Sequence, residues 1–205
     1  MSSEVLYAFF ATCLLLILTP GPDLIFVVSQ SITRGRKLGF AVALGQVGGL
    51  IFHLSLFAFG VSTLIVNSEW IYKSVKVLGG LYLLWLAYSA YKSEATISFE
   101  ETELSSNSFV GFMWKGLLMN VLNPKVMLFF LALFPSFISE QAGDIKEQVL
   151  ILGLVFITQT LVIFSVICII ASQLTDVLRD NKTFNTIVKW MQVILFTGLG
   201  LYVLL

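Results

Sequence analysis

The sequence predicts an all-α integral membrane protein whose six transmembrane helices form a 3+3 inverted repeat with broken helices 1 and 4. Three observations support this fold class. Of the 205 residues, 58% are hydrophobic and 12% are charged, whereas soluble domains have about half and about a quarter. Six apolar runs are each long enough to cross about 30 Å of hydrocarbon. Prolines interrupt the first and fourth runs at corresponding places.

The apolar runs predict helices rather than barrel strands, because they are long and uniformly apolar and a lipid-exposed backbone must satisfy its own hydrogen bonds. We interpret the first run as a mature helix rather than a signal peptide. Glu4 stands where a basic region is expected, and polar residues 19–23 stand where small residues would mark a cleavage site. The predicted spans are residues 5–28, 38–66, 71–91, 109–138, 149–172 and 186–205.

The distribution of charge excludes a nucleic-acid partner and predicts an orientation. Twelve Lys and Arg balance twelve Asp and Glu, so the chain has no positive field to attract nucleic acid. Basic residues gather at the odd-numbered loops, which places these loops in the cytoplasm and both termini outside it. Those near odd loops are Arg34, Arg36, Lys37, Lys92, Lys115, Arg179, Lys182 and Lys189; those near even loops are Lys73, Lys76 and Lys146.

The chain divides into two halves of three helices. Residues 1–92 form the first predicted repeat and residues 109–205 the second, joined by a polar cytoplasmic linker at 93–108. Because three is odd, the second half must enter the membrane from the opposite side, so any similarity between the halves is inverted. Two short matches support the repeat: Pro22-Asp23 with Pro124-Lys125, and Gly-Leu-Tyr at 80–82 with Gly-Leu-Tyr at 200–202.

The prolines predict where the lead helices break. A proline lacks an N–H and collides with the carbonyl four residues earlier, so Pro20 should free the carbonyl of Leu16 and Pro124 that of Asn120. A helix broken at membrane depth needs protein or a water-filled cavity to supply partners, and its ends suit a charged ligand. The alternative is an ordinary proline kink with a packing role. Residues that favour binding flank the breaks: Thr19, Gly21, Pro22, Asn120 and Asn123.

Two charged residues, Asp23 and Lys125, fall deep within spans, each directly after a break proline. A charge at the bilayer centre costs about 2.5–3.5 kcal/mol on insertion scales, so the chain must pair or use it. Counted from Arg34 and Lys115 at the cytoplasmic ends, both lie about 15–17 Å along a continuous helix. We therefore expect them to flank one central site. The alternative is a permanent ion pair that locks the helices together.

Three further polar residues lie within spans. His53, with a reference pKa of about 6.5, is either a proton carrier or a hydrogen-bonded core residue. Gln46 and Gln159 either reach a common cavity with the breaks or make ordinary interhelical hydrogen bonds.

The motifs that the chain lacks weigh against catalysis and metal binding. It contains no H-E-x-x-H, no G-x-S-x-G, no P-loop and no paired cysteines, and a single histidine cannot build a His-rich metal centre. Cys13 and Cys168 lie in apolar runs, which is typical of small core residues. The sequence thus predicts no enzyme, no metal site and no cofactor.

Four segments together resemble the LysE/RhtB superfamily of bacterial amino-acid exporters: Thr19-Pro20-Gly21-Pro22, Gly39 and Gly45 after a basic turn, Leu-Gly-Gly-Leu-Tyr-Leu at 78–83, and Asn123-Pro124-Lys125. The resemblance implies amino-acid efflux across the bacterial inner membrane, driven by the proton gradient, by a protein that is often a homodimer. It also implies a functional core of Pro20, Gly21, Pro22, Asn123, Pro124 and Lys125. Many relatives carry Asn where this chain has Asp23, so a carboxylate there cannot be the proton carrier of the whole family.

These observations predict a secondary transporter that exports a small, neutral amino acid by proton antiport with alternating access. Asp23 would bind the substrate ammonium and Lys125 its carboxylate, and Asp23 or His53 would carry the coupling proton. The alternatives are export of another small solute, such as a metal cation, and an integral membrane enzyme. The predicted substrate-binding residues are Thr19, Pro20, Gly21, Pro22, Asp23, Gln46, Asn120, Asn123, Pro124 and Lys125.

Overall fold

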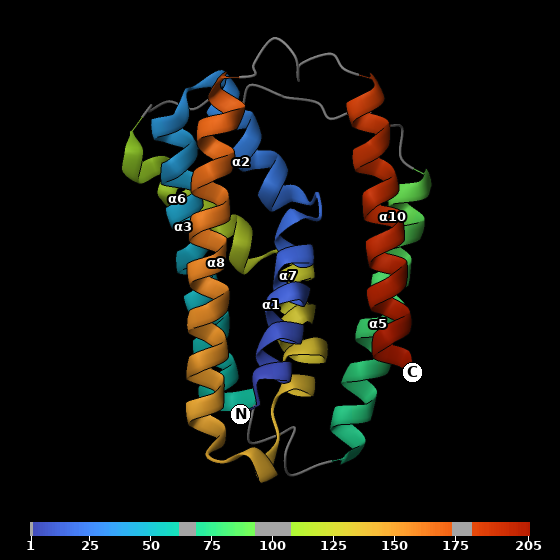
Figure 1. The fold of residues 1–205 in the computed structure, drawn as a ribbon. Coiled ribbons are helices and arrows are strands. Elements are labelled where there is room, and N and C mark those ends of the chain that lie inside the picture. The colour runs from blue at the N-terminus through green and yellow to red at the C-terminus, as the bar shows by residue number, and fades with distance from the viewer. Residues whose placement is uncertain (1, 62–68, 93–107, 174–181) are drawn as a thin grey trace.

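The computed structural model describes residues 2–61, 69–92, 108–173 and 182–205. Within these ranges the protein is helical and contains no strand, which confirms the all-α prediction (Figure 1). The predicted linker lies outside the described residues except for Ser108, whose hydroxyl accepts a hydrogen bond from the Gly111 N–H at 3.0 Å and so caps the following helix.

Both lead helices break at their prolines, as predicted. Helix α1 (Ser3–Leu18) and helix α2 (Pro22–Thr33) meet at 56°. Helix α6 (Phe109–Val121) and the helical stretch that begins with α7 (Pro124–Leu128) meet at 48°. This stretch continues through the π-helical turn η2 (Phe129–Leu133) into the 3₁₀ turn η3 (Phe134–Phe137).

The remaining helices are mostly long. They are α3 (Arg36–Leu56), which continues into the π-helical turn η1 (Phe57–Val61), α5 (Glu69–Lys92), η4 (Glu140–Ala142), α8 (Ile145–Gln173) and α10 (Lys182–Leu204). Among the described residues, α3 with its extension and α8 are long and apolar enough to cross a membrane. Each bent pair qualifies as a further span, which makes up to four of the six predicted.

Helices α5 and α10 pack together as a pair that stands beside the other helices (Figure 1). Glycines allow their close approach, because a Cβ at Gly200 would lie 3.1 Å from the carbonyl oxygen of Gly80. A second close crossing joins α3 and α6, where a Cβ at Gly45 would lie 1.8 Å from the carbonyl oxygen of Met113. Small residues at these two crossings thus let the helix backbones come close together.

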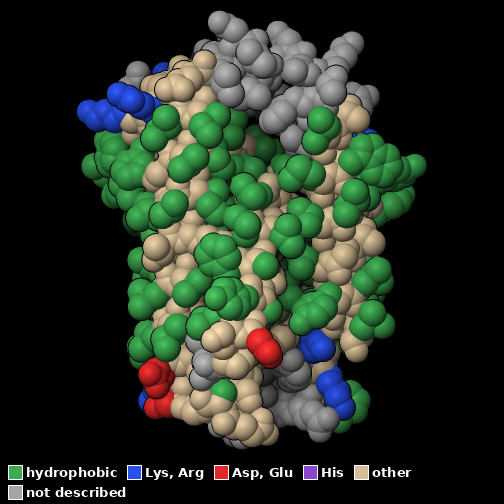
Figure 2. Space-filling model, in the orientation of Figure 1, with side chains coloured by type: hydrophobic (Ala, Val, Ile, Leu, Met, Phe, Trp, Pro, Cys, Tyr) green, Lys and Arg blue, Asp and Glu red, His purple; other side chains and the backbone are tan. Residues whose placement is uncertain are grey.

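The surface suits a lipid environment. Figure 2 shows hydrophobic side chains over the middle of the visible face, with charged side chains near its two ends. Large apolar residues such as Phe59, Leu122 and Trp85 are exposed, which a soluble protein would avoid in such number. Both chain ends lie toward the same end of the molecule in Figure 1.

Candidate functional site

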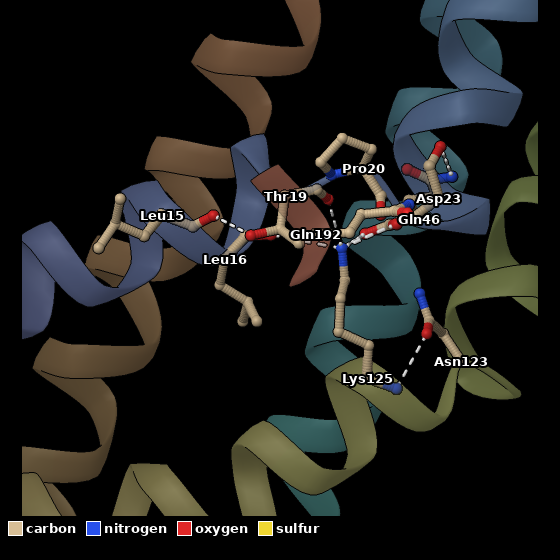
Figure 3. Close-up of polar contacts among 9 residues, drawn as sticks. All are labelled: Leu15, Leu16, Thr19, Pro20, Asp23, Gln46, Asn123, Lys125 and Gln192. Atoms are coloured by element: carbon tan, nitrogen blue, oxygen red, sulfur yellow. Dashed lines mark hydrogen bonds and ion pairs between the residues drawn. The ribbon is translucent and has the colours of Figure 1, made fainter. Parts of the chain in front are cut away.

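The two helix breaks meet in the interior, and their charged residues touch. The Lys125 ammonium lies 2.8 Å from Oδ2 and 2.9 Å from Oδ1 of Asp23 (Figure 3). Both residues are buried, with 4% and 3% of their surfaces exposed for Asp23 and Lys125 respectively. The two residues that were expected to face each other across the breaks are therefore in direct contact. This contact fits both alternatives, a permanent ion pair and the two sides of a substrate site.

Lys125 also closes the end of α1. Its ammonium donates to the carbonyl oxygens of Leu16 at 3.3 Å and Thr19 at 3.1 Å. The Leu16 carbonyl is the one that Pro20 was expected to free. These carbonyls belong to the C-terminal end of α1, where the helix dipole is negative and favours a cation. Lys125 itself stands in the first turn of α7, where that helix's dipole disfavours a cation, so its position depends on the partners from the first break.

The local sequence of the first break shapes this end of α1. The Thr19 hydroxyl and N–H both return to the Leu15 carbonyl, at 2.5 Å and 2.9 Å. Gly21 is extended and precedes Pro22, the first residue of α2. A Cβ at Gly21 would lie 2.6 Å from Oδ1 of Asp23 and 3.0 Å from the Lys125 ammonium. Glycine is needed here for close approach to the ion pair rather than for an unusual φ.

The second break is closed by its own residues. The side-chain oxygen of Asn123 accepts a hydrogen bond from the Lys125 N–H at 3.0 Å, which is an N-cap for α7. The Asn123 N–H donates to the Asn120 carbonyl at 3.0 Å. Nε2 of His53 lies 3.2 Å from that same carbonyl oxygen, and its ring stacks on Phe130. Pro124 was expected to free this carbonyl, and His53 contacts it from α3.

The two buried glutamines make hydrogen bonds between helices. Nε2 of Gln46 donates to the Asp23 carbonyl at 3.0 Å, which ties α3 to the start of α2. Nε2 of Gln159 donates to the Phe10 carbonyl at 3.0 Å. Gln159 lines an apolar groove of about 550 Å³ between α1 and α8, so the idea that it shares a cavity with the breaks is wrong. Periodicity placed it midway along a helix but could not show which neighbour that helix meets.

A cavity of about 410 Å³ lies against both breaks. Its walls come from the two breaks and from the α5–α10 pair, so it separates that pair from the breaks. The break residues that line it are Pro20, Gly21, Pro22, Asn123, Pro124 and Lys125, and the others are Tyr82, Trp85, Leu86, Ser89, Ala90, Gln192 and Phe196.

The residues from α5 and α10 were not predicted. Nε2 of Gln192 donates to the Pro20 carbonyl, which joins α10 to the first break (Figure 3). Ser89 and Gln192 are polar residues inside otherwise apolar runs, and that signal could have marked them. It is weak, because such residues also occur at helix–helix contacts throughout membrane proteins.

Four predicted residues do not line the large cavity. Asp23 and Asn120 instead border a cavity of about 10 Å³ on another side of the ion pair, which is room for about one water molecule. Within the described residues, the side-chain oxygens of Asn120 and of Thr160, which also borders this cavity, have no hydrogen-bond partner. Thr19 and Gln46 are buried and line neither cavity. Each instead makes a hydrogen bond at the first break, Thr19 to the Leu15 carbonyl and Gln46 to the Asp23 carbonyl.

The site offers one carboxylate, one ammonium, backbone carbonyls and a few neutral polar groups. Across the described parts of the chain, no three His, Cys, Asp or Glu side chains come together as metal ligands would. Opposite single charges beside a cavity of this size are complementary to a small zwitterion. This donor set does not resemble the ligand clusters that hold transition metals.

Comparison with known proteins identifies the family to which the chain belongs. The model of the LysE type translocator family matches residues 14–205. The chain is similar to the threonine efflux protein of Escherichia coli, at 28% identity over 199 residues that cover 92% of each chain. It is also similar to the homoserine/homoserine lactone efflux protein of Salmonella typhimurium, at 29% identity over 92% of this chain and 91% of that protein. The membrane protein YahN of Escherichia coli is 33% identical over 65% of this chain and 62% of YahN. No solved structure matches the chain.

Proposed function

Because the chain belongs to the LysE type translocator family, we propose that it exports a small, neutral amino acid from bacteria by alternating access. The family is one of translocators rather than enzymes. Relatives that align over most of the chain are named for efflux of threonine and of homoserine and its lactone; threonine and homoserine are small, neutral amino acids. The observation that carries the proposal is the buried Asp23–Lys125 pair, which joins the two helix breaks beside the 410 Å³ cavity.

In this proposal the pair recognises the two ends of the zwitterion. The Asp23 carboxylate and the carbonyls at the end of α1 bind the ammonium, and Lys125 binds the carboxylate. The substrate side chain then faces α5 and α10, where Ser89, Tyr82 and Gln192 offer polar groups among apolar ones. A dibasic substrate is disfavoured, because its second cation would lie near Lys125.

The proposed architecture is the 3+3 inverted repeat of residues 1–92 and 109–205. Equivalent residues of two repeats come close to one another near a pseudo-twofold axis, and two such pairs support the assignment. Asp23 contacts Lys125, and Gly80 packs against Gly200. We place the protein in the inner membrane with both termini outside the cytoplasm, as the basic residues favour. A homodimer is part of the proposal and is tested by cross-linking in membranes.

Proton antiport is the proposed energy source, with Asp23 and His53 as coupling candidates. His53 is linked to the site through the Asn120 carbonyl, because Asn120 borders the small cavity beside the ion pair. Protonation of Asp23 would weaken its hold on the substrate ammonium and so couple substrate release to proton entry. If His53→Ala and Asp23→Asn each left proton-driven export unchanged, this coupling scheme would be wrong.

The test is transport by the purified protein in liposomes. Vesicles loaded with single radiolabelled amino acids, threonine, homoserine and serine among them, are given a proton gradient, and efflux is compared with that from protein-free vesicles. We expect faster efflux of small neutral amino acids and little change for lysine. A growth-inhibition panel with toxic amino-acid analogues, in cells with and without overexpression, gives an independent ranking. If no amino acid left protein-containing vesicles faster than empty ones, amino-acid export would be excluded.

A further inference from the structure

We propose that the oxygen atoms around the Lys125 ammonium form the ammonium subsite of the transporter, and that Lys125 fills this subsite whenever no substrate is bound. Loading is then an exchange: the substrate ammonium enters, and Lys125 leaves to meet the substrate carboxylate. This inference rests on the proposed function and adds an order of events to it. It also removes the choice between a structural ion pair and a substrate site, because the pair becomes the resting state of the site.

The subsite is built for a primary ammonium group. Two carboxylate oxygens and two backbone carbonyl oxygens lie 2.8–3.3 Å from the Lys125 nitrogen. A primary ammonium has three N–H donors and no acceptor, which matches a ring made only of acceptors. The carbonyls belong to a half-helix C-terminus, an arrangement that binds cations in broken-helix transporters. A substrate α-ammonium has the same charge, donors and size as the group already present.

The subsite adjoins the cavity. Lys125 lines the 410 Å³ cavity together with Gly21 and Pro20. Gly21 lies directly over the ion pair, where even a Cβ would approach the Lys125 ammonium to 3.0 Å. No side chain at position 21 therefore stands between the cavity and the ring of oxygens. A small ammonium compound in the cavity can reach the ring once the lysine side chain swings aside on its four-carbon stem.

Charge balance explains why the exchange selects zwitterions. In the resting state Asp23 and Lys125 neutralise each other. A zwitterion keeps both partnered, because its ammonium replaces Lys125 on Asp23 and its carboxylate receives the displaced lysine. A simple amine would leave Lys125 as a buried cation without an anion, and a simple acid would compete with Asp23 for one lysine. Both would leave a charge unpaired in a low-dielectric site, which is strongly unfavourable.

The first experiment empties the subsite. Lys125→Ala protein is purified in detergent with ethylammonium present and its thermal unfolding is measured with and without 50 mM of this probe, with tetramethylammonium as the control for ionic strength. We expect ethylammonium to raise the Tm of Lys125→Ala by about 4 °C or more, the shift that ligand binding well above its Kd produces. Wild type and Lys146→Ala, which loses an exposed lysine, should not respond, and adding Asp23→Asn to Lys125→Ala should abolish the response.

Recovery of folded Lys125→Ala only in ethylammonium supports the proposal equally. A folded Lys125→Ala that ignores ethylammonium overturns it, and so does a response of equal size in wild type. If the variant is not recovered even with the probe, the ring does not accept a free ammonium in place of the lysine, and the proposal is likewise wrong.

The second experiment uses wild type and needs no variant. Its thermal stability is compared with threonine, with 1-amino-2-propanol, which keeps the ammonium but lacks the carboxylate, and with 3-hydroxybutyrate, which lacks the ammonium. We expect threonine to stabilise at least tenfold more effectively, by concentration, than either analogue. An amine that binds as well as the amino acid would contradict the exchange. If no amino acid stabilises wild type while ethylammonium stabilises Lys125→Ala, the proposed function fails but the ammonium subsite stands.

Discussion

Prolines make both helix breaks, but the first break presents hydrogen-bond acceptors and the second presents a cation. In the first, Pro20 and Pro22 leave carbonyl oxygens at the end of α1 that accept hydrogen bonds from a distant lysine. In the second, Asn123 caps the new helix and its N–H donates to the Asn120 carbonyl, and the buried Lys125 side chain extends to the first break. The first break is thus an acceptor of cations and the second supplies one.

The difference follows from what stands beside each proline. Asn123 has a side chain that can satisfy the backbone of its own break, whereas Gly21 at the equivalent place has none. The carbonyl oxygens that the first break exposes receive their hydrogen bonds from other helices, from Lys125 at Leu16 and Thr19 and from Gln192 at Pro20. A broken helix that cannot complete itself is a natural place for a ligand ammonium.

Exchanging the two charges is the strongest test of this difference between the breaks. In Asp23→Lys with Lys125→Asp, the two charges would still attract, but a carboxylate would now face the carbonyls of Leu16 and Thr19. We expect export to fall by at least about a hundredfold, because repulsion at the end of α1 replaces attraction. The measurement is efflux from liposomes, with circular dichroism to verify folding. Export by the swapped protein near the wild-type rate would make the pair purely structural and would remove the substrate site.

Neutralising one partner should have the next largest effect. Asp23→Asn leaves the Lys125 ammonium buried with only neutral acceptors, a loss of about 3–5 kcal/mol in comparable buried pairs. We expect lower thermal stability and at least about tenfold slower export. Glu147→Gln, which neutralises an exposed carboxylate, is the control. Wild-type stability in Asp23→Asn would mean that the backbone carbonyls suffice to hold the lysine.

The sequence predicted the breaks well because a proline acts locally. The missing N–H and the clash four residues back required nothing beyond the chain itself, so the free carbonyls of Leu16 and Asn120 could be named in advance. The common depth of Asp23 and Lys125 followed from helix rise alone. The wall that includes Ser89 and Gln192 was not predicted, because polar residues inside an apolar run do not show how α5 and α10 stand against the rest. Uniformly apolar runs carry little information about such neighbours, since lipid and protein select similar side chains.

Adding one carbon at Gly21 tests how closely the first break must fit the ion pair. Gly21→Ala would place a Cβ 2.6 Å from Oδ1 of Asp23, so the ion pair must shift. A shift of this kind near a binding group commonly costs about ten- to a hundredfold in rate, and we expect export to slow by about tenfold. Gly198→Ala is the matched control, because a Cβ at Gly198 meets nothing within 4 Å. Equal export by the two alanine variants would mean that the geometry at Gly21 does not matter.

The smallest expected effect belongs to the second break, and it follows from that break being self-contained. Asn123→Ala removes the side-chain cap of α7, which is worth about 1 kcal/mol. We expect a Tm lower by a few degrees and export reduced by about two- to threefold, because the first break still holds Lys125 through Asp23, Leu16 and Thr19. Ser108→Ala, which removes a cap of the same kind from α6 at the exposed start of that helix, is the control for stability.

The informative comparison is with Gly21→Ala, since each variant changes one break by a few atoms. If Asn123→Ala slowed export more than Gly21→Ala did, the second break would be the more demanding of the two, and the cation-accepting role assigned to the first would need to be shared between them.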